Sequence, residues 1–549
     1  MAGMLACAAC AGVGPRPDLP LDPPSFYTVT AEIALSRHQA RVAALQYTAA
    51  VEEDRDPELL RRATDVTLEC LQPSLTAVVA ARWIDVDPSA VDAHRAAARA
   101  ALELHKIDQS AAHYRVVLNS SPRGPDGEFA VLETELAAAG NVYGARQLAD
   151  RLAGDFPASS AALKMQAFAT LRADDPASAV RTFEAALAAT TADTERRELT
   201  QGLWRAQVLA GDVQQPLARA KDLAEREPTA EHRLDYALVL VAAQQDEAAR
   251  TQLALLAHDP ESNAVALRLL GLLDFQEGKM DDAATRFVEL VTTGKFLDDG
   301  LYYLGMIAER HGDLERALRL YAEVQSGENA LPALLRAAAI LRSHGAAPAS
   351  DELLDQLVSE QPQRAPDIMA ARARIYADAG DLPQAMAVLD QGEQEYPDSV
   401  DLRYARASME EEQGRIAAAL KELAAVAGLR PDDPAALNAY GYTLADNRRQ
   451  LVLARKLIEQ AHAAAPKNAA ILDSLGWVLF RQGHGEQALP YLTAAYADVH
   501  DGDVAAHLGE VYWQLGRHDE AERVWSEASR PGLDNHLLNS TRLRLHAAN

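Results

Sequence analysis

The sequence has little of what several protein classes require. Of 549 residues only 3 are cysteine, and aromatic residues make up 5% of the chain. Three cysteines, at positions 7, 10 and 70, are too few for a disulfide framework, so we expect core packing to hold the fold together. No apolar run reaches the 18 or more residues of a membrane-spanning helix. Any membrane attachment is therefore expected to depend on an anchor.

Positive charge is also scarce. The chain has 53 Lys and Arg against 80 Asp and Glu, a formal net charge of −27. Nonspecific binding to a phosphate backbone needs clustered cations, and anionic membrane surfaces attract basic segments. The balance therefore predicts no nucleic-acid partner and disfavours direct adsorption to a membrane.

What the sequence does contain is a high proportion of hydrophobic residues, 48%, rich in Ala and Leu. This composition suits small, closely packed helices and predicts an all-α fold. A Gly or Ala then recurs at intervals of 34 residues, or close to 34 at the last two positions: Gly271, Gly305, Ala339, Ala373, Ala407, Gly441, Gly476 and Gly509. Only a small side chain at such a position lets a partner helix approach closely.

A second helix is expected after each of these positions. Most are followed by a turn glycine, by a second small residue about twelve places on, and by a large apolar residue four places later, as in Gly278, Ala283 and Phe287. Proline closes many hairpins, where it cannot interrupt a helix. The spacing predicts one missing residue near residues 346–350 and one added residue near residues 447–452.

The 34-residue pattern resembles the tetratricopeptide repeat (TPR) family from about Ser25 to Asn535. The resemblance implies a superhelical solenoid of about fifteen antiparallel helical hairpins, with a concave face suited to protein segments. We divide the chain into a tether at 1–24, degenerate repeats at 25–236, a well-formed array at 237–535 and a capping segment at 536–549.

The first residues are small and apolar and include Cys7 and Cys10, followed by a stretch rich in Pro and Gly. This resembles the end of a bacterial lipoprotein signal, which makes Cys7 and Cys10 candidates for lipidation and predicts a location on the periplasmic side of the outer membrane. No Lys or Arg precedes the apolar stretch, a departure from secretory signals that leaves an uncleaved, cytoplasmic chain as the alternative.

Motifs of catalysis are missing from the sequence. It contains no phosphate-binding loop, no Gly-x-Ser-x-Gly elbow and no His-Glu-x-x-His pair. Cys7 to Cys10 has the CxxC form but precedes a Pro-rich tether, and Cys70 lies in an apolar stretch that predicts a buried, structural residue. We expect no enzyme activity, no cofactor and no metal site.

A binding surface can be predicted from the resemblance. In the TPR family, the groove is lined by positions six and three before, and one and four after, the small residue of the first helix. This rule selects Arg268, Phe275, Tyr302, Met306, Arg336, Arg374, Tyr404, Asn438, Tyr442, Asp473, Trp477, Phe480 and Trp513. Aromatic residues, Met and Arg dominate interface hot spots. The alternative is that several of them pack between helices.

Three C-terminal segments, 438–446, 471–477 and 506–513, carry a narrower resemblance to proteobacterial envelope TPR lipoproteins. One of these binds a periplasmic carboxyl-terminal processing protease and presents cell-wall (peptidoglycan) hydrolases to it. The resemblance implies an adaptor with such a protease and its hydrolase substrates as partners. The alternative function is a scaffold for envelope or polysaccharide assembly that has no protease partner.

Overall fold

The computed structural model of the chain describes residues 24–52, 54–259, 261–529 and 535–547, and within these ranges all the regular structure is helical. The helices of the first half are α1 (Pro24–Ser36), α2 (Ala40–Ala50), α3 (Pro57–Glu69), α4 (Pro73–Val86), α5 (Val91–Glu103), α6 (Ile107–Ser120), α7 (Gly124–Ala138), α8 (Val142–Asp155), α9 (Ser160–Arg172), α10 (Pro176–Ala189), α11 (Asp193–Leu209), α12 (Gln214–Arg226), α13 (Ala230–Ala242) and α14 (Asp246–Leu256). None of the helices in the described ranges has the length and apolar character needed to cross a membrane.

The second half continues in the same way, with one short 3-10 turn at Pro362–Arg364. Its helices are α15 (Asn263–Gln276), α16 (Met280–Thr292), α17 (Leu297–Arg310), α18 (Leu314–Ala322), α19 (Ala330–Ser343), α20 (Ala347–Glu360), α21 (Ala365–Asp378), α22 (Leu382–Glu395), α23 (Val400–Glu412), α24 (Ile416–Leu429), α25 (Pro434–Asp446), α26 (Leu451–Ala464), α27 (Ala469–Arg481), α28 (Gly485–Val499), α29 (Gly502–Gln514), α30 (His518–Ala528) and α31 (His536–Ala547).

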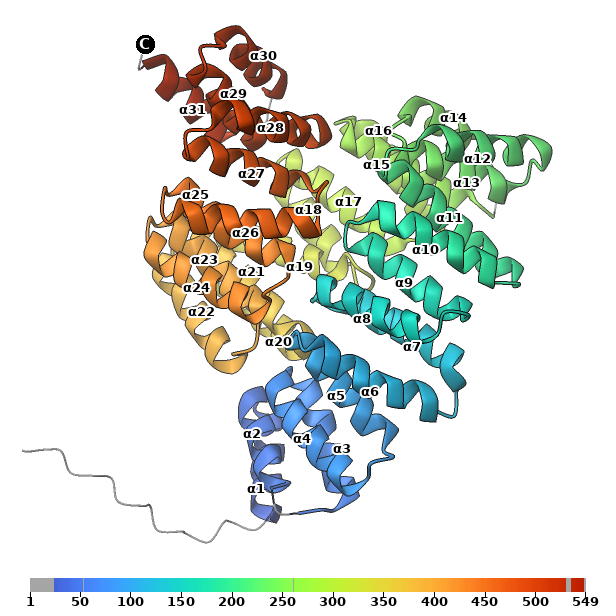
Figure 1. Cartoon of the computed structure of the whole chain (residues 1–549), viewed down its shortest axis with the longest axis vertical. Helices are drawn as coiled ribbons and strands as arrows, with labels where there is room; N and C mark the ends of the chain where they lie inside the picture. The colour runs from blue at the N-terminus through green and yellow to red at the C-terminus, as the bar shows by residue number, and fades with distance from the viewer. Residues whose placement is uncertain (1–23, 53, 260, 530–534, 548–549) are drawn as a thin grey trace, which may run out of the picture.

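Consecutive helices pair along the chain from α1/α2 to α29/α30, fifteen pairs in all, of which α7/α8 and α11/α12 are the most open, and α31 packs on α29 at the C-terminal end. The predicted all-α solenoid of about fifteen hairpins is confirmed. The chain winds as a superhelix in which α1–α6 lie at the bottom of Figure 1, α7–α16 on the right and α21–α26 on the left. The predicted boundary at residue 237 falls inside α13, so no break in the helices accompanies the change in sequence regularity.

The small residues of the repeat do lie where two helices approach closely. A Cβ added at Gly271 would lie 2.9 Å from the ring of Phe287 on the second helix of the same hairpin. The same position in the last hairpin, Gly509, lies against the indole of Trp525, where a Cβ would come within 1.9 Å of Nε1. Glycine at these positions therefore sets the distance between the paired helices.

One hairpin corrects the predicted register. The small residue of α19 is Ala338, which is fully buried, and not Ala339, which is partly exposed. The Ser350 hydroxyl donates to the Ala338 carbonyl at 2.8 Å from twelve residues along the chain, as Ser110 does to Ala98 in the α5/α6 hairpin. The missing residue therefore precedes Ala338, and the predicted deletion at 346–350 is wrong.

The predicted insertion at residues 447–452 is confirmed. α25 ends at Asp446 and α26 begins at Leu451, and the turn between them holds Arg448 at φ 51° and Gln450 at φ 44°. Two left-handed residues replace the single turn glycine of the other C-terminal hairpins.

Most turns inside the hairpins place a residue at positive φ, but the residue type differs; in the N-terminal half only the α11/α12 turn uses glycine, Gly211, among the described residues. Seven C-terminal hairpins place a glycine at positive φ: Gly278, Gly312, Gly345, Gly380, Gly414, Gly483 and Gly516. Five N-terminal hairpins place another residue there: His38, Leu71, His105, Asp174 and Gln244, with φ between 53° and 59°. Because the left-handed region is unfavourable for residues other than glycine, these turns are more strained.

Candidate protein-binding surface

The predicted groove residues all lie on first helices of their hairpins, from α15 to α29. Asp473 and Trp477 are buried, Arg374 is exposed, and the other predicted residues are partly buried. The structure brings them together in two groups, one on α25, α27 and α29 and one on α15, α17 and α19.

The first group is the C-terminal cluster, which we define as Tyr442, Asp473, Trp477, Phe480 and His507. His507 lies at its centre: its Nδ1 is 2.9 Å and 3.0 Å from the two carboxylate oxygens of Asp473. The Trp477 indole stacks on the same imidazole, with ring centroids 4.0 Å apart and planes 24° apart. Phe480 lies 5.4 Å from Trp477, and Tyr442 lies 6.0 Å from His507.

A second set of contacts fixes the orientation of the Trp477 ring. Its Nε1 donates to the Asp446 carboxylate at 3.1 Å, and Arg481 donates to the same oxygen at 3.1 Å. The Arg481 guanidinium also lies over the indole, 4.2 Å from its centroid. These hydrogen bonds and ring contacts link α25, α27 and α29 and so hold the cluster in a fixed orientation.

Carboxylates surround the cluster. Burial raises the pKa of Tyr442 well above its ordinary value, and four nearby carboxylates raise it further: Asp446, Asp473, Asp503 and Glu411. Burial also raises the pKa of Glu411, with a smaller contribution from Asp446 and an opposing hydrogen bond from Thr443. This part of the inner face is therefore negatively charged and favours cationic groups.

The second group is a chain of rings that crosses the α15/α16 and α17/α18 hairpins and ends at Arg336 on α19. Phe275 on α15 meets Tyr303 on α17 at 5.4 Å in an edge-to-face arrangement, and Tyr303 lies beside Tyr302. Tyr302 lies 6.1 Å from Tyr321, whose hydroxyl accepts from Arg336 at 3.1 Å. Arg268 pairs with Asp299 at the α15 end of this chain.

The groove rule selects Arg336 only when it is counted from Ala339, which is not the small residue of α19. With Ala338 as the small residue, the rule gives Leu335 and Arg342, while Arg336 binds Glu309 of the preceding hairpin at 2.9 Å. Arg342 is nearly buried and lies 3.7 Å from the ring centroid of Tyr376. Arg336 therefore links neighbouring hairpins, and its predicted role in the groove rested on the misplaced deletion.

The remaining predicted residues do not join either group. Trp513 packs at the C-terminal end, 4.8 Å from His546 and 5.7 Å from Trp525. Arg374 pairs with Asp378 at 2.8 Å, and Tyr404 is half-buried, which raises its pKa to about 12. Met306 and Asn438 are partly buried on α17 and α25.

Sequence reasoning missed two features of the inner face. His507 lies in the segment 506–513, but its position two residues before Gly509 is not one that the groove rule selects. The second feature is a cleft of about 400 Å³ formed by α7, α8, α9 and α11, with Leu136, Met165, Phe168 and Arg205 among its lining residues. The sequence signal for this region is the pair Ala167 and Ala179. These residues have the twelve-residue spacing of the small residues in one hairpin, and both are fully buried.

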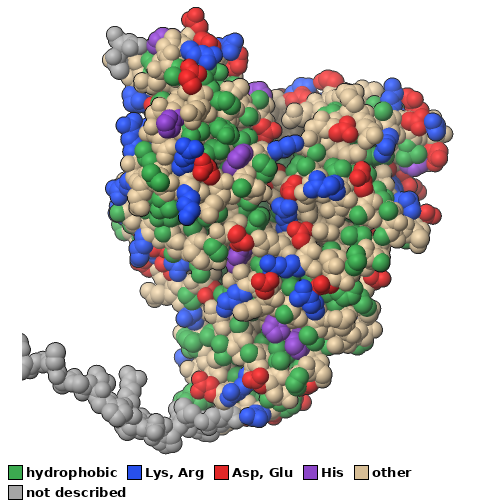
Figure 2. Space-filling view, viewed as in Figure 1, with side chains coloured by type: hydrophobic (Ala, Val, Ile, Leu, Met, Phe, Trp, Pro, Cys, Tyr) green, Lys and Arg blue, Asp and Glu red, His purple; other side chains and the backbone are tan. Residues whose placement is uncertain are grey.

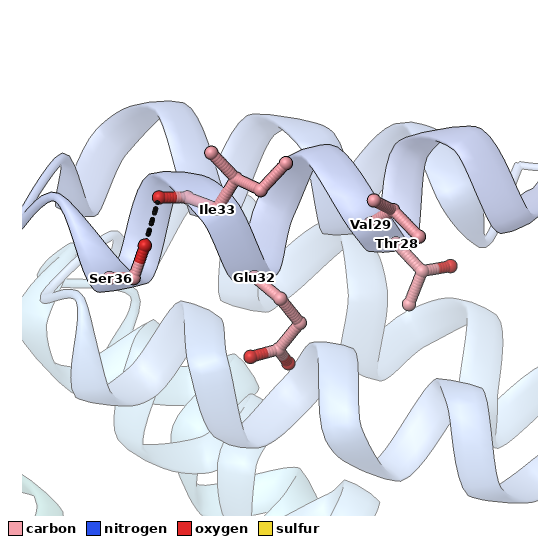
Figure 3. A pocket seen from close by; sticks show the side chains of 5 residues that line it. All are labelled: Thr28, Val29, Glu32, Ile33 and Ser36. Atoms are coloured by element: carbon pink, nitrogen blue, oxygen red, sulfur yellow. Dashed lines mark hydrogen bonds between the residues drawn. The ribbon is translucent and has the colours of Figure 1, made fainter.

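A shallow pocket also lies on the outer side of α1. Figure 3 shows its lining side chains, of which Val29 and Ile33 are 60% and 46% exposed. No preceding hairpin covers this face within the described part of the chain.

The cysteines divide between described and undescribed segments. Cys7 and Cys10, the lipidation candidates, lie outside the described residues. Cys70 is buried among apolar side chains, as predicted, and burial raises the pKa of its thiol to about 12. In the ranges that the structure covers, no three His, Cys, Asp or Glu side chains are placed to hold a metal ion.

Comparison with known proteins agrees with this architecture. The tetratricopeptide repeat family matches residues 268–332 and 474–532. A TPR repeat-containing protein of Pseudomonas aeruginosa, PA4667, is 38% identical over 214 residues, which cover 39% of this chain and 36% of that protein. The chain thus spans about a third of the length of this curated relative. Parts of the chain are therefore similar in sequence to TPR proteins.

Solved structures with similar helical arrays include yeast Tom70 and the Cut9 subunit assembly of the APC/C. The Tom70 structure covers 96% of this chain and 95% of its own, at 12% identity and a TM-score of 0.33. The Cut9–Hcn1 structure covers 95% and 96%, at 13% identity and a TM-score of 0.32.

Proposed function

We propose that the protein is a non-catalytic adaptor whose inner face binds segments of partner proteins and brings them to a periplasmic carboxyl-terminal processing protease. The C-terminal cluster carries the proposal. It places aromatic rings, an imidazole and several carboxylates on one rigid surface, built from the repeats whose sequences resemble envelope TPR lipoproteins.

Rigid aromatic surfaces suit protein binding because they offer contact area without a large loss of side-chain entropy. Within the cluster, Asp473, Trp477 and His507 are buried and hold the surface in shape. Tyr442 and Phe480 are partly exposed and are the residues left to contact a partner. The surrounding carboxylates favour partner segments that carry Lys or Arg.

The protease and its cell-wall hydrolase substrates are proposed as partners because of the three C-terminal segments. The proposed location, the periplasmic side of the outer membrane, follows from Cys7 and Cys10 as lipidation candidates. These two parts of the proposal are independent, so each has its own experiment.

The partner is tested by crosslinking in cells with a tag at the C-terminus, followed by mass spectrometry of the co-purified proteins. We expect a carboxyl-terminal processing protease together with peptidoglycan hydrolases. Recovery of assembly or export components alone would make the protein a scaffold without a protease partner.

The surface is tested with the variants Tyr442→Ala and Phe480→Ala. Loss of a hot-spot ring weakens binding about 30-fold or more, which corresponds to about 2 kcal/mol. The matched control is Val452→Ala, since Val452 is 83% exposed on the second helix of the α25/α26 hairpin. Equal recovery of partners by all three variants would show that this surface is not the binding site.

The anchor is tested by mass spectrometry of the N-terminal peptide and by membrane fractionation of the Cys7→Ser and Cys10→Ser variants. We expect one of the two substitutions to release the protein from the membrane fraction. A soluble wild-type protein with an unmodified N-terminus would refute the proposed location and leave the adaptor proposal to the crosslinking result.

A further inference from the structure

The superhelix meets itself after about ten hairpins. Residues of the first six hairpins, most of them in or next to the turns, contact the end of α22 and the linkers that join α22 to α23, α24 to α25 and α26 to α27. We call these contacts the seam; they are Arg41–Glu395, Gln72–Glu395, Ser74–Asp398, His105–Asp432, Gln147–Asp432, Asp174–Asn468 and Ala210–Lys467. The two limbs that meet there are visible in Figure 1, and Figure 2 shows charges of both signs and histidine interspersed on this face.

One end of the seam is buried. Gln72 is 1% exposed, and its Nε2 donates to the Glu395 carbonyl at 2.8 Å while its Oε1 accepts from Arg41 at 2.9 Å. The neighbouring Leu71 packs against the apolar cluster of α19–α23. Apolar contact and buried hydrogen bonds make this end the firmest part of the seam.

The middle of the seam depends on Asp432. Its carboxylate accepts from His105 Nε2 and, at 2.7 Å, from Gln147. The His105 ring is oriented by the buried Asn141, whose amide lies 3.1 Å from Nδ1. His105 therefore presents Nε2 to the opposite limb in a fixed direction.

The other end is exposed and weakly held. Asn468 donates to Asp174 at 3.1 Å, and Lys467 donates to the Ala210 carbonyl at 3.2 Å, both at the surface. Exposed polar contacts of this kind contribute little because water replaces them readily. The strength of the seam thus falls from Gln72 towards Lys467.

The backbone of the turns points to a specific role for these side chains. Leu71, His105 and Asp174 hold positive φ, where glycine would be less strained, and all three reach the opposite limb. The C-terminal hairpins, whose turns make none of the seam contacts, have glycine at this position in seven cases. A strained backbone at a residue whose side chain contacts a distant part of the chain indicates a functional constraint.

The seam brings two distant parts of the chain together. Asp432 accepts hydrogen bonds from His105 and Gln147, which lie 327 and 285 positions away in the sequence, so the two limbs face one another along the seam. Closed contacts of this kind would obstruct the entry of a folded partner between the limbs.

We propose that the seam is a gate that opens from the Asp174–Asn468 end, with Leu71 and Gln72 as the hinge, and admits polypeptide to the inner face from the side. The nature of the polypeptide rests on the proposed function, but the opening itself does not. It can therefore be measured without a partner.

The opening is measured by pulsed electron paramagnetic resonance on the full chain, in a Cys7→Ser, Cys10→Ser background. Spin labels at Asp212→Cys and Ala470→Cys, both exposed, report on the weak end. Labels at Arg37→Cys and Gln394→Cys, also exposed, form the matched pair at the firm end. We expect two distance populations at the weak end and one at the firm end. Equal distributions at both ends would overturn the proposed direction of opening.

Access to the inner face is measured by a reporter cysteine at Ser408, an exposed residue on α23 directly after the small residue Ala407. The variant Asp432→Ala removes two hydrogen bonds to a charged group and is expected to raise the rate of labelling by a 5 kDa maleimide polymer about tenfold. N-ethylmaleimide, which is small enough to enter a closed superhelix, should react at a nearly unchanged rate.

The controls separate opening from unfolding. The exposed acid Asp498, outside the seam, is replaced in the control variant Asp498→Ala, and a cysteine at Val452 reports on the outer surface. Neither should change the ratio of polymer to small-molecule labelling. An unchanged ratio in Asp432→Ala would refute the gate, even if crosslinking recovers the protease. Unfolding of the Asp432→Ala variant would raise the rates of labelling by both the polymer and N-ethylmaleimide. The spin-label distances, which are measured without a substitution among the seam contacts, then test the gate.

Discussion

The N-terminal and C-terminal halves build the same hairpin from different residues. In α15–α31, glycine occupies many of the close helix contacts and most of the turns. In α1–α14, the buried small residues include Ala98, Ala167 and Ala237, and the turns hold His, Leu, Asp and Gln at positive φ. Glycine therefore makes the repeat visible in the sequence, but the same hairpin also forms where alanine and other residues take its place.

The difference has a structural reason. In three of the N-terminal turns the residue at positive φ, Leu71, His105 or Asp174, reaches the other limb, so its side chain forms contacts that glycine would lose. The C-terminal turns make no such contacts, and glycine there relieves the backbone. The N-terminal half, whose repeats are more degenerate, therefore has more turn residues that make long-range contacts.

The largest effect is expected for Gly509→Ala. The added Cβ would overlap the buried indole of Trp525, which is fully enclosed, so something must shift. We expect a loss of about 3 kcal/mol in the free energy of unfolding, measured by denaturant titration. Gly428→Ala is the control, because its Cβ would meet nothing within 4 Å, and it should stabilise α24 by about 0.5–1 kcal/mol. A mild effect at Gly509 would mean that the close contact tolerates expansion.

The next effect is expected for Asp473→Ala, which leaves His507 buried without its carboxylate partner. The loss should be about 2 kcal/mol, since removal of the acceptor leaves a buried imidazole N–H without a hydrogen-bond partner. The N-terminal counterpart is Glu128→Ala, where a carboxylate 1% exposed is bound by Arg95, Ser121 and Arg123. Similar losses in thermal or denaturant unfolding would show that both halves depend equally on buried polar links. A loss confined to Asp473 would make those links a property of the C-terminal half.

Acid should act on the N-terminal half through Glu128. Burial raises its pKa, but hydrogen bonds from Ser121 and Arg95 outweigh this and lower it below the ordinary value of 4.5. The carboxylate therefore contributes stability above about pH 4.5, and this contribution disappears as the pH falls through the folded-state pKa. The Glu128→Gln variant should lose less stability than the wild type between pH 5 and pH 3 in thermal unfolding. Parallel pH curves for the two proteins would contradict this assignment.

The smallest effect tests the turns directly. Gln244 is exposed at φ 55°, and Gln244→Gly should raise the free energy of unfolding by about 1 kcal/mol by relieving strain. The reciprocal variant, Gly380→Gln, places a side chain at φ 84° and should lower it by a similar amount. If glycine at 244 destabilised the protein, the strain would have to be compensated by a contact of Gln244.

Much of the fold was predictable because each hairpin contacts mainly its neighbours. The spacing of Gly271, Gly305 and Gly441 predicted the paired helices, and the turn at Asn447–Gln450 followed from one extra residue. The register at Ala338 was not predictable in this way, since Ala338 and Ala339 are chemically equivalent and only burial distinguishes them. The binding role of the predicted row, and of Tyr442 and Phe480 within it, stays a prediction.

The period, the hairpins and their stacking follow from the amino-acid sequence alone, because contacts between adjacent repeats recur at a fixed spacing. The place of His507 at the centre of the C-terminal cluster and the contact of His105 with Asp432 emerge only in the folded chain. Contacts between residues more than 300 positions apart depend on the accumulated curvature of all the hairpins between them, and a repeating pattern does not record that curvature.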